Sequence, residues 1–461
     1  MKNKIPICGY NKYPKLKLFA SSFIISWLLS GLIFNSQAQT ANLGKLLHQV
    51  ETNAPALKAV NSNAKIYEAN RREGLGTLFG SVDAFGQLQY FNDNRLTRPI
   101  SPPINFATLP FDTKQIGYGL SLTLPLDING QISTHLNSLV HQERAAAYDA
   151  QQFRLALLNQ AAALYHGIES ISGKLEALNK QAYSIRKQLK VTIIAIKVGR
   201  RAPVDSLRME SELSNVEGQI ADANGTNTRL RAYLSALLNQ PVFSDSVAPP
   251  VKTPDEIQNS PFLKLAAMRD INNRPDIQSI NEKVLAAKSG VTTSWLSFLP
   301  KAVLQGSWME NQGFNGKGKD APFWQLGVTV DLPIWTGLTR VARIQEAEAR
   351  SDAALYQSNA LKASAKAEIV SAIGDWNSGK AQFIAAENSL KSAEEVERIQ
   401  TEQFNQGRLS VTDYLDAEAK LAFSRASFSA ALAHWWQADD SLRLAQGLAP
   451  SAYTNYSEVS K

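Results

Sequence analysis

Few side chains in this chain of 461 residues have a type and spacing that could support chemistry. Residues 313–320 read GFNGKGKD and approach the glycine-rich loop that cradles phosphate groups. The segment lacks the Ser or Thr that would bind the metal. It also leads into a predicted strand, whereas a helix N-terminus would be needed to hold phosphate. We therefore predict a flexible loop here and no nucleotide site.

Metal-binding and nucleophilic residues are equally sparse. The five histidines include no pair four residues apart. The two closest, His135 and His141, would point about 240° apart on a helix of 3.6 residues per turn. The only cysteine, Cys8, precedes the first apolar run. No nucleophile stands beside a candidate base, so the sequence predicts no enzyme. The scattered histidines and the single cysteine predict no metal site, and no cofactor is predicted.

One segment that carries glycine and charged residues occurs twice. Residues 198–213, VGRRAPVDSLRMESEL, return at 406–421 as QGRLSVTDYLDAEAKL, an offset of 208 residues. The identical pairs are Gly199 and Gly407, Arg200 and Arg408, Asp205 and Asp413, Leu207 and Leu415, and Glu210 and Glu418. An earlier pair, 53–57 and 273–277, is 220 residues apart, so the first copy carries about 12 extra residues. The chain is therefore predicted to be an internal tandem duplication.

A strand hairpin must precede each copy of this segment. Apolar residues alternate with small or polar ones over 115–126 and again over 324–334, which is typical of strands with one apolar face. About eleven residues is also the length of a tilted strand that crosses a bilayer. Turn-rich loops at 91–114 and 310–323 follow weaker partner strands. The two predicted hairpins cover about 81–126 and about 301–334.

Long helices must follow each hairpin. Prolines are absent from 126 to 202 and from 334 to 449, and good helix formers dominate both stretches. A helix over about 131–197 would be about 100 Å long at 1.5 Å per residue, which no compact domain accommodates. We therefore predict a coiled coil or an extended barrel of helices. The second long helix is predicted at about 338–405, and the returning helices at 203–240 and 410–446.

The first 38 residues resemble a cleaved signal peptide. Five lysines and no acid precede the apolar run at 18–34, and Ser36-Gln37-Ala38 provides a cleavage signal. A membrane anchor is the alternative, for which the apolar run is short. Cleavage lowers the formal net charge from +7 to +2, so the basic composition does not indicate nucleic acid. It also removes Cys8, which leaves no disulfide and no cysteine-linked lipid anchor.

The predicted domains follow from these segments. They are the signal peptide (1–38), the first repeat (39–243), a linker (244–260), the second repeat (261–450) and a C-terminal tail (451–461). A sheet of a soluble domain would show the same alternation in its strands. Aromatic residues near the loop ends favour a membrane girdle instead; these are Tyr90, Trp308, Phe323 and Trp324.

Hairpin, long helix, glycine turn and returning helix, repeated behind a signal peptide, resemble the TolC family of outer-membrane efflux proteins. The resemblance is most specific at 273–290, 298–308 and 403–421. It implies an α+β membrane protein of the Gram-negative outer membrane. Each chain of a homotrimer would give four strands to one β-barrel, which a long periplasmic α-helical barrel continues. Closure by several chains also follows from the strands, because an open sheet edge in lipid would leave backbone groups unpaired.

The resemblance further implies the partners and the function. The partners would be outer-membrane lipid, a periplasmic adaptor (membrane fusion) protein and an inner-membrane pump. The chain would be the passive exit duct of a tripartite efflux or type I secretion system. An extended coiled-coil adaptor or structural protein of the cell envelope is the alternative, but it has no need for alternating strands. A monomeric porin fails because four strands cannot close a barrel.

Site residues come from the same resemblance. Acids at the start of the family's returning helix form carboxylate rings that narrow the entrance, and Asp413 and Asp416 match them. Asp413 has a second interpretation, because Ser410 and Asp413 also form a capping box. Leu409 stands where the best-known members have a gate-linking arginine, so no salt-bridge latch is carried over. The implied adaptor contacts are Gly199, Arg200, Asp205, Gly407 and Arg408.

Overall fold

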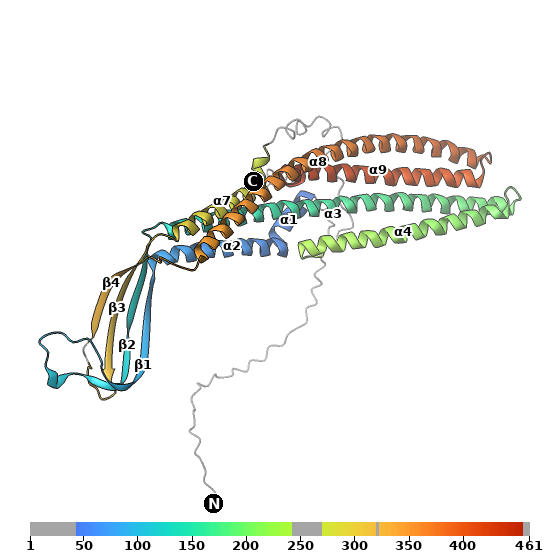
Figure 1. Cartoon of the computed structure of the whole chain (residues 1–461). Coiled ribbons are helices and arrows are strands. Elements are labelled where there is room, and N and C mark those ends of the chain that lie inside the picture. Colours follow the sequence, from blue (N-terminus) through green and yellow to red (C-terminus); the bar gives the residue numbers. More distant parts are fainter. Residues whose placement is uncertain (1–42, 242–269, 320–321, 455–461) are drawn as a thin grey trace, which may run out of the picture. The chain divides into compact units, whose positions relative to one another are not determined.

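The computed structural model describes residues 43–241, 270–319 and 322–454. The predicted signal peptide and linker lie outside these ranges, as does the end of the predicted tail. The described chain is mostly helical and contains one small antiparallel sheet (Figure 1). None of its described helices carries an apolar stretch of the length that crossing a membrane requires.

Two runs of elements follow the same order. The first consists of α1 (Leu43–Asn53), α2 (Pro55–Gly76), β1 (Ser81–Leu96), β2 (Phe111–Leu126), α3 (Gln131–Lys197) and α4 (Pro203–Leu238). The second consists of α7 (Pro275–Leu296), β3 (Lys301–Gly313), β4 (Phe323–Asp331), α8 (Thr339–Asn405) and α9 (Val411–Ala445). Single 3-10 turns occur at Thr77–Phe79, Phe106–Thr108 and Ile271–Asn273.

Local chemistry explains where several helices begin. Pro55 and Pro275 occupy the first turns of α2 and α7, where the missing N–H costs nothing. The carboxylate of Asp127 accepts hydrogen bonds from the N–H groups of Ile132 (2.9 Å) and Ser133 (2.8 Å), which are first-turn donors of α3. Helix α8 has no such side-chain cap.

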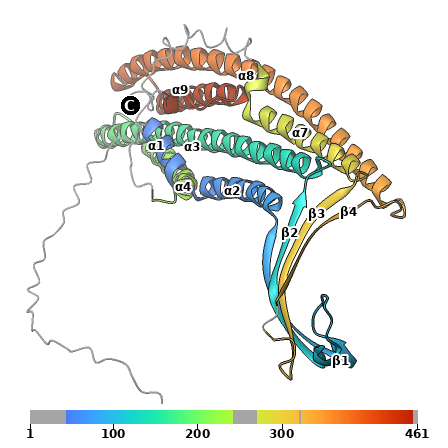
Figure 2. The same ribbon diagram turned by 90° about the vertical axis from the view of Figure 1, so that its left-hand side faces the viewer.

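The sheet has the strand order β1-β2-β3-β4, and every neighbouring pair is antiparallel (Figure 2). Leu120 of β2 pairs with Ala84 of β1 on one side and with Trp308 of β3 on the other. In the described chain, β1 and β4 each have one partner. Both outer edges therefore present backbone N–H and C=O groups for further pairing.

The two faces of the sheet differ in polarity. Residues paired across antiparallel strands share a face. One face gathers Val82, Leu88, Tyr118, Leu120, Trp308, Leu326, Val328 and Val330. The other carries mostly small and polar residues, among them Gln87, Ser121, Thr123, Gln305, Gln325 and Thr329. The apolar face is exposed, since Val328 is 58% exposed and Val330 is 61% exposed. On β4 the polar face is exposed as well.

The strand ends depart from the sequence-based expectation in three places. Strand β3 continues to Gly313, into the loop predicted at 310–323. Strand β1 continues to Leu96 and β2 begins at Phe111, so the loop predicted at 91–114 is shorter. Strand β4 ends at Asp331, and 332–334 of the predicted strand lie beyond it. Pro333 has no N–H to donate, and an edge strand has a single partner to hold it.

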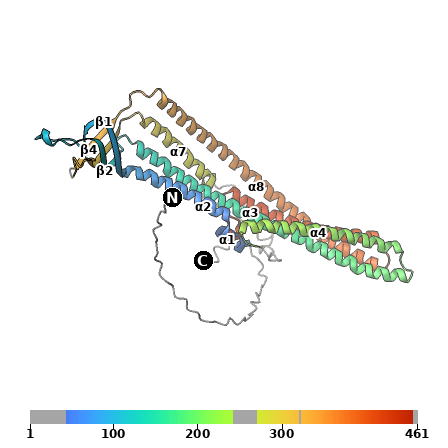
Figure 3. The ribbon, with the colours of Figure 1, turned by 90° about the horizontal axis from the view of Figure 1, so that it is seen from below.

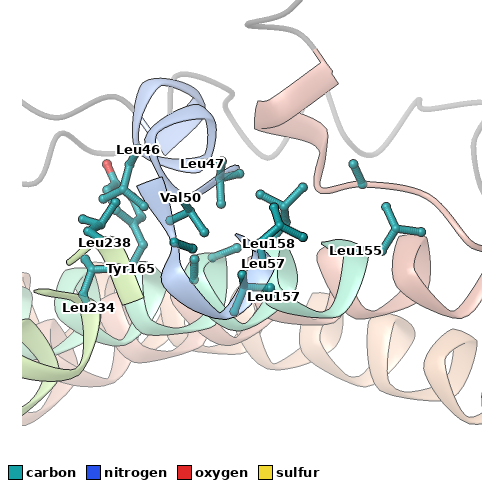
Figure 4. Close-up of a cluster of buried hydrophobic side chains, with 14 of the residues drawn as sticks. Leu46, Leu47, Val50, Leu57, Leu155, Leu157, Leu158, Tyr165, Leu234 and Leu238 are labelled. Atoms are coloured by element: carbon teal, nitrogen blue, oxygen red, sulfur yellow. The ribbon is translucent and has the colours of Figure 1, made fainter. Parts of the chain in front are cut away.

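The helices are held together by three apolar clusters. Helix α3 lies beside α4 and α8 lies beside α9 (Figure 1), while α3 also packs against α7 and α9. The first cluster joins α1, α2, α3 and α4 and includes Leu47, Val50, Leu158, Tyr165 and Leu234 (Figure 4). The second joins α3, α4, α8 and α9 and includes Ile185, Met209, Val216, Phe404 and Tyr414. The third joins α8 and α9 through Trp376, Phe383, Trp435 and Leu442.

Candidate functional site

Two turns mark the candidate site: the first tip, Val198–Ala202, joins α3 to α4, and the second tip, Gln406–Ser410, joins α8 to α9. Both lie at the same end of the helices (Figures 1 and 3). The Arg208 guanidinium of α4 donates a hydrogen bond to the Thr412 hydroxyl of α9 at 3.2 Å. The predicted adaptor contacts and the predicted acids therefore lie on one end of the described chain.

The two tips have the same backbone turn. Gly199 and Gly407 have φ angles of 73° and 74°, in the left-handed region that favours glycine. The N–H of each glycine donates to a carbonyl in the last helical turn, Gly199 to Ile196 (3.0 Å) and Gly407 to Phe404 (3.0 Å). The following arginine N–H reaches one residue further back at both tips. This pair of bonds is the Schellman ending of a helix.

The helices that leave the tips begin differently. Helix α4 starts at Pro203 after Ala202, and no side chain caps it. Helix α9 starts after Ser410, whose hydroxyl oxygen accepts from the Asp413 N–H (3.1 Å) and whose O–H donates to the Asp413 carboxylate (2.7 Å). Asp413 is thus part of a built cap, worth about 0.5–2 kcal/mol.

The predicted acids differ in their partners. Asp416 is 61% exposed and forms an ion pair with Lys420 one turn further along α9 (2.8 Å). Asp413 and Asp416 are three residues apart on one helix, so they lie on nearly the same face. Asp205, in the first turn of α4 after the first tip, is less exposed and lies 4.0 Å from the Arg201 guanidinium.

Arg201 is a tip residue that the sequence analysis missed. Its guanidinium lies 4.0 Å from the centre of the Phe404 ring and donates to the Phe404 carbonyl at 3.2 Å. Phe404 in turn stacks on Tyr414, with ring centres 4.6 Å apart. Arg201 therefore ties the first tip to the second helix pair. Repetition alone could not identify it, because Leu409 stands 208 residues later; the signal was the second arginine of the Gly-Arg-Arg run.

The predicted adaptor contacts are otherwise open. The side chains of Arg200 and Arg408 are exposed, as are the two glycines before them. No side chain contact of either arginine is recorded in the part of the chain that the structure describes. The tips therefore combine a fixed backbone with cationic groups that solvent, or a partner, can reach.

A buried acid lies behind the second tip. Glu418 is 4% exposed and accepts hydrogen bonds from the Tyr414 hydroxyl (2.9 Å) and the Ser184 hydroxyl. Burial raises the pKa of Glu418, and the charge of Glu397 adds to this effect against the two hydrogen bonds. Glu418 lines an open groove of about 820 Å³ between α3, α4, α8 and α9, together with Lys180, Tyr183, Arg231 and Arg425.

A second buried polar group joins α3 to α9 further from the tips. His166 is 2% exposed, and its ring nitrogens lie 2.8 Å from Glu169 and 3.3 Å from Asp440. Burial lowers the pKa of His166, but the hydrogen bonds and charges of both acids outweigh burial and raise it to about 9. Within 43–241, 270–319 and 322–454, no group of three His, Cys, Asp or Glu residues is arranged to hold a metal ion.

The segment that approaches a phosphate-binding loop has a different setting. Its first residue, Gly313, ends β3, and the next element that the structure describes is β4. The Gly313 N–H bonds to the Lys317 carbonyl (2.9 Å), as in a tight turn. A strand follows the segment, so no helix N-terminus is available to bind phosphate.

Comparison with known proteins identifies the family. Residues 46–240 and 269–448 match the family model described as outer membrane efflux protein. The chain belongs to this family. It is 22% identical over 320 residues to nodulation protein T of Rhizobium leguminosarum bv. trifolii, a match that spans 68% of each chain. It is 20% identical over 383 residues to the solvent efflux pump outer membrane protein SrpC of Pseudomonas putida, over 80% of this chain and 76% of SrpC.

A solved structure shows the same fold. The Campylobacter jejuni CmeC outer membrane channel superimposes with a TM-score of 0.75 at 19% identity, over 97% of this chain and 98% of CmeC. The fold is thus that of the TolC-like channels, mostly helical with a small sheet. Members of the outer membrane efflux protein family are channel proteins, and the chain is accordingly a transport protein and not an enzyme.

Proposed function

We propose that this chain is the passive exit duct of a tripartite efflux or type I secretion system in a Gram-negative outer membrane. The observation that carries the proposal is the sheet, which exposes an apolar face and whose two outer strands each have a single partner within the described residues. In water, the exposed apolar face and the unpaired strand edges would both be unfavourable. In lipid the apolar face is stabilised, but the open edges are not.

Association of several chains would pair the open strand edges. Unpaired backbone groups in hydrocarbon cost several kcal/mol each, so membrane-spanning sheets close into barrels. Four strands are too few to close, whereas three chains would supply twelve. We infer a homotrimer in which β1 of one chain pairs with β4 of the next. Family membership and the likeness to an outer membrane channel support this arrangement.

The helices would then form the periplasmic part of the duct. Helices α3 and α8 each contain 67 residues, which corresponds to about 100 Å at 1.5 Å per residue. That length would carry the conduit from the outer membrane across much of the periplasm. An inner-membrane pump and a periplasmic adaptor would complete it, as the name of the solvent efflux relative supports. A signal peptide cleaved after Ala38 would direct the chain there without a lipid anchor.

The tips would form the entrance. Three copies of Asp413 and Asp416 would bring six carboxylates toward one axis, narrowing the mouth and favouring cations. Adaptor contacts are assigned to residues that either shape the turns or project from them: Gly199, Arg200, Asp205, Gly407 and Arg408. The exposure of both arginines supports this assignment.

A matched pair of substitutions tests the membrane role of the sheet. Val328 and Thr329 are neighbours on β4 that point to opposite faces. Arginine at Val328 should cost about 2–4 kcal/mol if that face meets lipid. It should sharply lower the fraction of protein that assembles, measured as mass in detergent. Arginine at Thr329 should assemble normally and change conductance in planar bilayers.

The wild-type chain should have the mass of three chains in the same experiment. A stable monomer would contradict the duct, because a single chain has no means to close the barrel. Equal loss of assembly in both variants would show that the alternation does not report lipid exposure.

A further inference from the structure

A second exposed apolar surface lies where the second hairpin meets its helices. It combines the end of α7 with the link between β4 and α8, and we call it the second foot. Its members are Trp295, Phe298, Ile334, Trp335 and Arg340. Trp295 is 56% exposed, Trp335 is 77% exposed and Ile334 is 93% exposed. Within the described residues, Trp295, Ile334 and Trp335 are thus mostly open to solvent.

Recorded contacts join the second foot into one surface. The rings of Trp295 and Phe298 have centres 6.4 Å apart. The Arg340 guanidinium lies 5.4 Å from the centre of the Phe298 ring and donates to the Pro333 carbonyl at 3.0 Å. Arg340 thus holds the link that carries Ile334 and Trp335 beside the Trp295–Phe298 pair at the end of α7.

The second foot continues the apolar face of the sheet. Leu326, Val328 and Val330 occupy that face on β4 at every second residue. The same spacing carries on past the strand end through Leu332, which is 52% exposed, to Ile334. Exposed apolar residues therefore follow the apolar row of β4 directly into the link.

The corresponding residues of the first hairpin are used differently. Asp127 stands 208 residues before Trp335, and its carboxylate caps α3. With Trp335 in that place, α8 has no side-chain cap, although a cap stabilises a helix by about 0.5–2 kcal/mol. Trp335 gains no burial in exchange. A tryptophan that stays exposed, in a place where an aspartate would cap the helix, indicates that Trp335 binds a partner outside the chain.

Charge identifies the chemistry of that partner. Arg340 and Arg343 lie three residues apart on α8, so they project from nearly the same face. The contacts recorded for Arg340 in the described residues are a carbonyl and a ring, neither of which neutralises its charge. Tryptophan is enriched where a bilayer meets water, and arginine forms charge-assisted hydrogen bonds with phosphate oxygens.

We propose that the second foot is a lipid-binding collar for the inner leaflet of the outer membrane. Ile334 and Trp335 insert among the acyl chains beside the barrel, and Arg340 with Arg343 binds the headgroup phosphate of an anionic phospholipid. The proposal rests on the proposed function, since it needs the sheet to lie in a membrane. It adds a specific lipid class and a specific place to that function.

Spin labels on single cysteines test the insertion, in a Cys8→Ser background reconstituted in phosphatidylcholine vesicles with phosphatidylglycerol. Labels at Ile334→Cys and Trp335→Cys should be more accessible to oxygen than to a water-soluble nickel chelate. Val328→Cys on the sheet is the positive control, and Val198→Cys at the first tip is the aqueous control. Val198 is 64% exposed, comparable to Val328.

Each outcome of this experiment is decisive. If Val328→Cys reports lipid while both foot positions report water, the collar is wrong and the duct stands. If Val328→Cys itself reports water, the proposed function fails. Foot labels that exclude both reagents and are immobile would show that a second copy of the chain covers the foot, which also overturns the collar.

The headgroup is tested by thermal unfolding of the detergent-solubilised protein with added phosphatidylglycerol or phosphatidylcholine. Phosphatidylglycerol should raise Tm, and Arg343→Gln should at least halve the rise without changing Tm in detergent alone. Arg340→Gln should do the same from a lower starting Tm, because Arg340 also holds the link. Arg350→Gln is the control, since Arg350 pairs with Glu346 on the same helix at the surface. An equal response to both lipids, or an unchanged response in Arg343→Gln, would overturn the anionic site.

Discussion

The two tips share a backbone and differ in their side chains. Each ends its long helix with a glycine at a φ near 73° and the same two backbone hydrogen bonds. The first tip continues with Arg201, Pro203 and, further along α4, Arg208. The second continues with Ser410, a capped Asp413 and Asp416. Both tips keep an arginine after the glycine and an aspartate in the next helical turn. They differ in charge at two places: Arg201 against Leu409, and Arg208 against Asp416.

This difference separates what the turn needs from what the surface does. The glycines and the Schellman bonds serve to reverse the chain, and they are needed equally at both tips. The charges at these two places are not required for reversal, because they differ between the tips while the turn is the same. Their placement is therefore the part of the tip that a partner or a permeating ion can select.

The largest difference between the tips lies in a buried side chain. Phe404, which precedes the second tip, is 3% exposed and contacts both Arg201 and Tyr414. Ile196, at the corresponding place before the first tip, is half-buried. We expect Phe404→Ala to destabilise the protein by about 3–5 kcal/mol. Ile196→Ala should cost about 1 kcal/mol. Thermal unfolding of both variants measures the two losses of stability. Equal losses would mean that Phe404 does not anchor the tips.

The shared turn should respond equally at both tips. Alanine at Gly199 or Gly407 must adopt a left-handed conformation, which costs about 1–2 kcal/mol. Gly218 lies inside α4, and a Cβ there would meet no atom within 4 Å. Gly218→Ala should therefore stabilise the protein by about 0.5–1 kcal/mol. Denaturant unfolding should therefore show a loss of stability for Gly199→Ala and Gly407→Ala and a gain for Gly218→Ala. A stabilising Gly407→Ala would show that the turn is not held in the left-handed region.

Much of the mostly helical fold with a small sheet could be predicted from local patterns. Alternation over 115–126 determines strand and face, and proline-free stretches rich in helix formers leave long helices as the only plausible structure. The strand ends were less predictable, because the end of β4 at Asp331 depends on its position at the sheet edge. Sequence position alone does not reveal which strand lies at an edge.

The candidate site was predictable only in part, for a physical reason. Gly199 and Gly407 are marked by repetition, and the Ser410 cap by its spacing to Asp413. The contact of Arg201 with Phe404 joins residues 203 positions apart, and no local pattern encodes it. The ring role of Asp413 and Asp416 needs several chains, so it stays a prediction.

Burial distinguishes another matched pair, Glu418 and Glu210. Glu418 is buried and its pKa is raised above 4.5 by burial, whereas Glu210 is exposed. A carboxyl with a raised folded-state pKa binds its proton more tightly in the folded protein. Its ionisation therefore costs stability as pH rises above 4.5, and the cost is complete above the folded-state pKa. Glu418→Gln should raise Tm near neutral pH.

The pH dependence provides the control for this variant. Below about pH 4.5 the Glu418 carboxyl is neutral in both states, so Glu418→Gln and wild type should converge. Glu210→Gln, at the exposed matched position, is the control variant. An advantage of Glu418→Gln that is equally large in acid would assign the effect to packing and not to charge.

The smallest expected effect on stability concerns the acids that distinguish the second tip. Asparagine at Asp413 keeps an oxygen that can accept the Ser410 hydroxyl, so the cap largely survives. Asp413→Asn with Asp416→Asn should therefore lower stability by a few tenths to about 1 kcal/mol, from lost charge at the helix start. If six carboxylates line the entrance, the same variant should lose cation selectivity and block by divalent ions in planar bilayers, because close like charges attract cations strongly in a confined ring. Asp205→Asn at the first tip is the matched control, and it should leave selectivity unchanged. Wild-type selectivity in the double variant would refute the ring and leave Asp413 with its capping role alone.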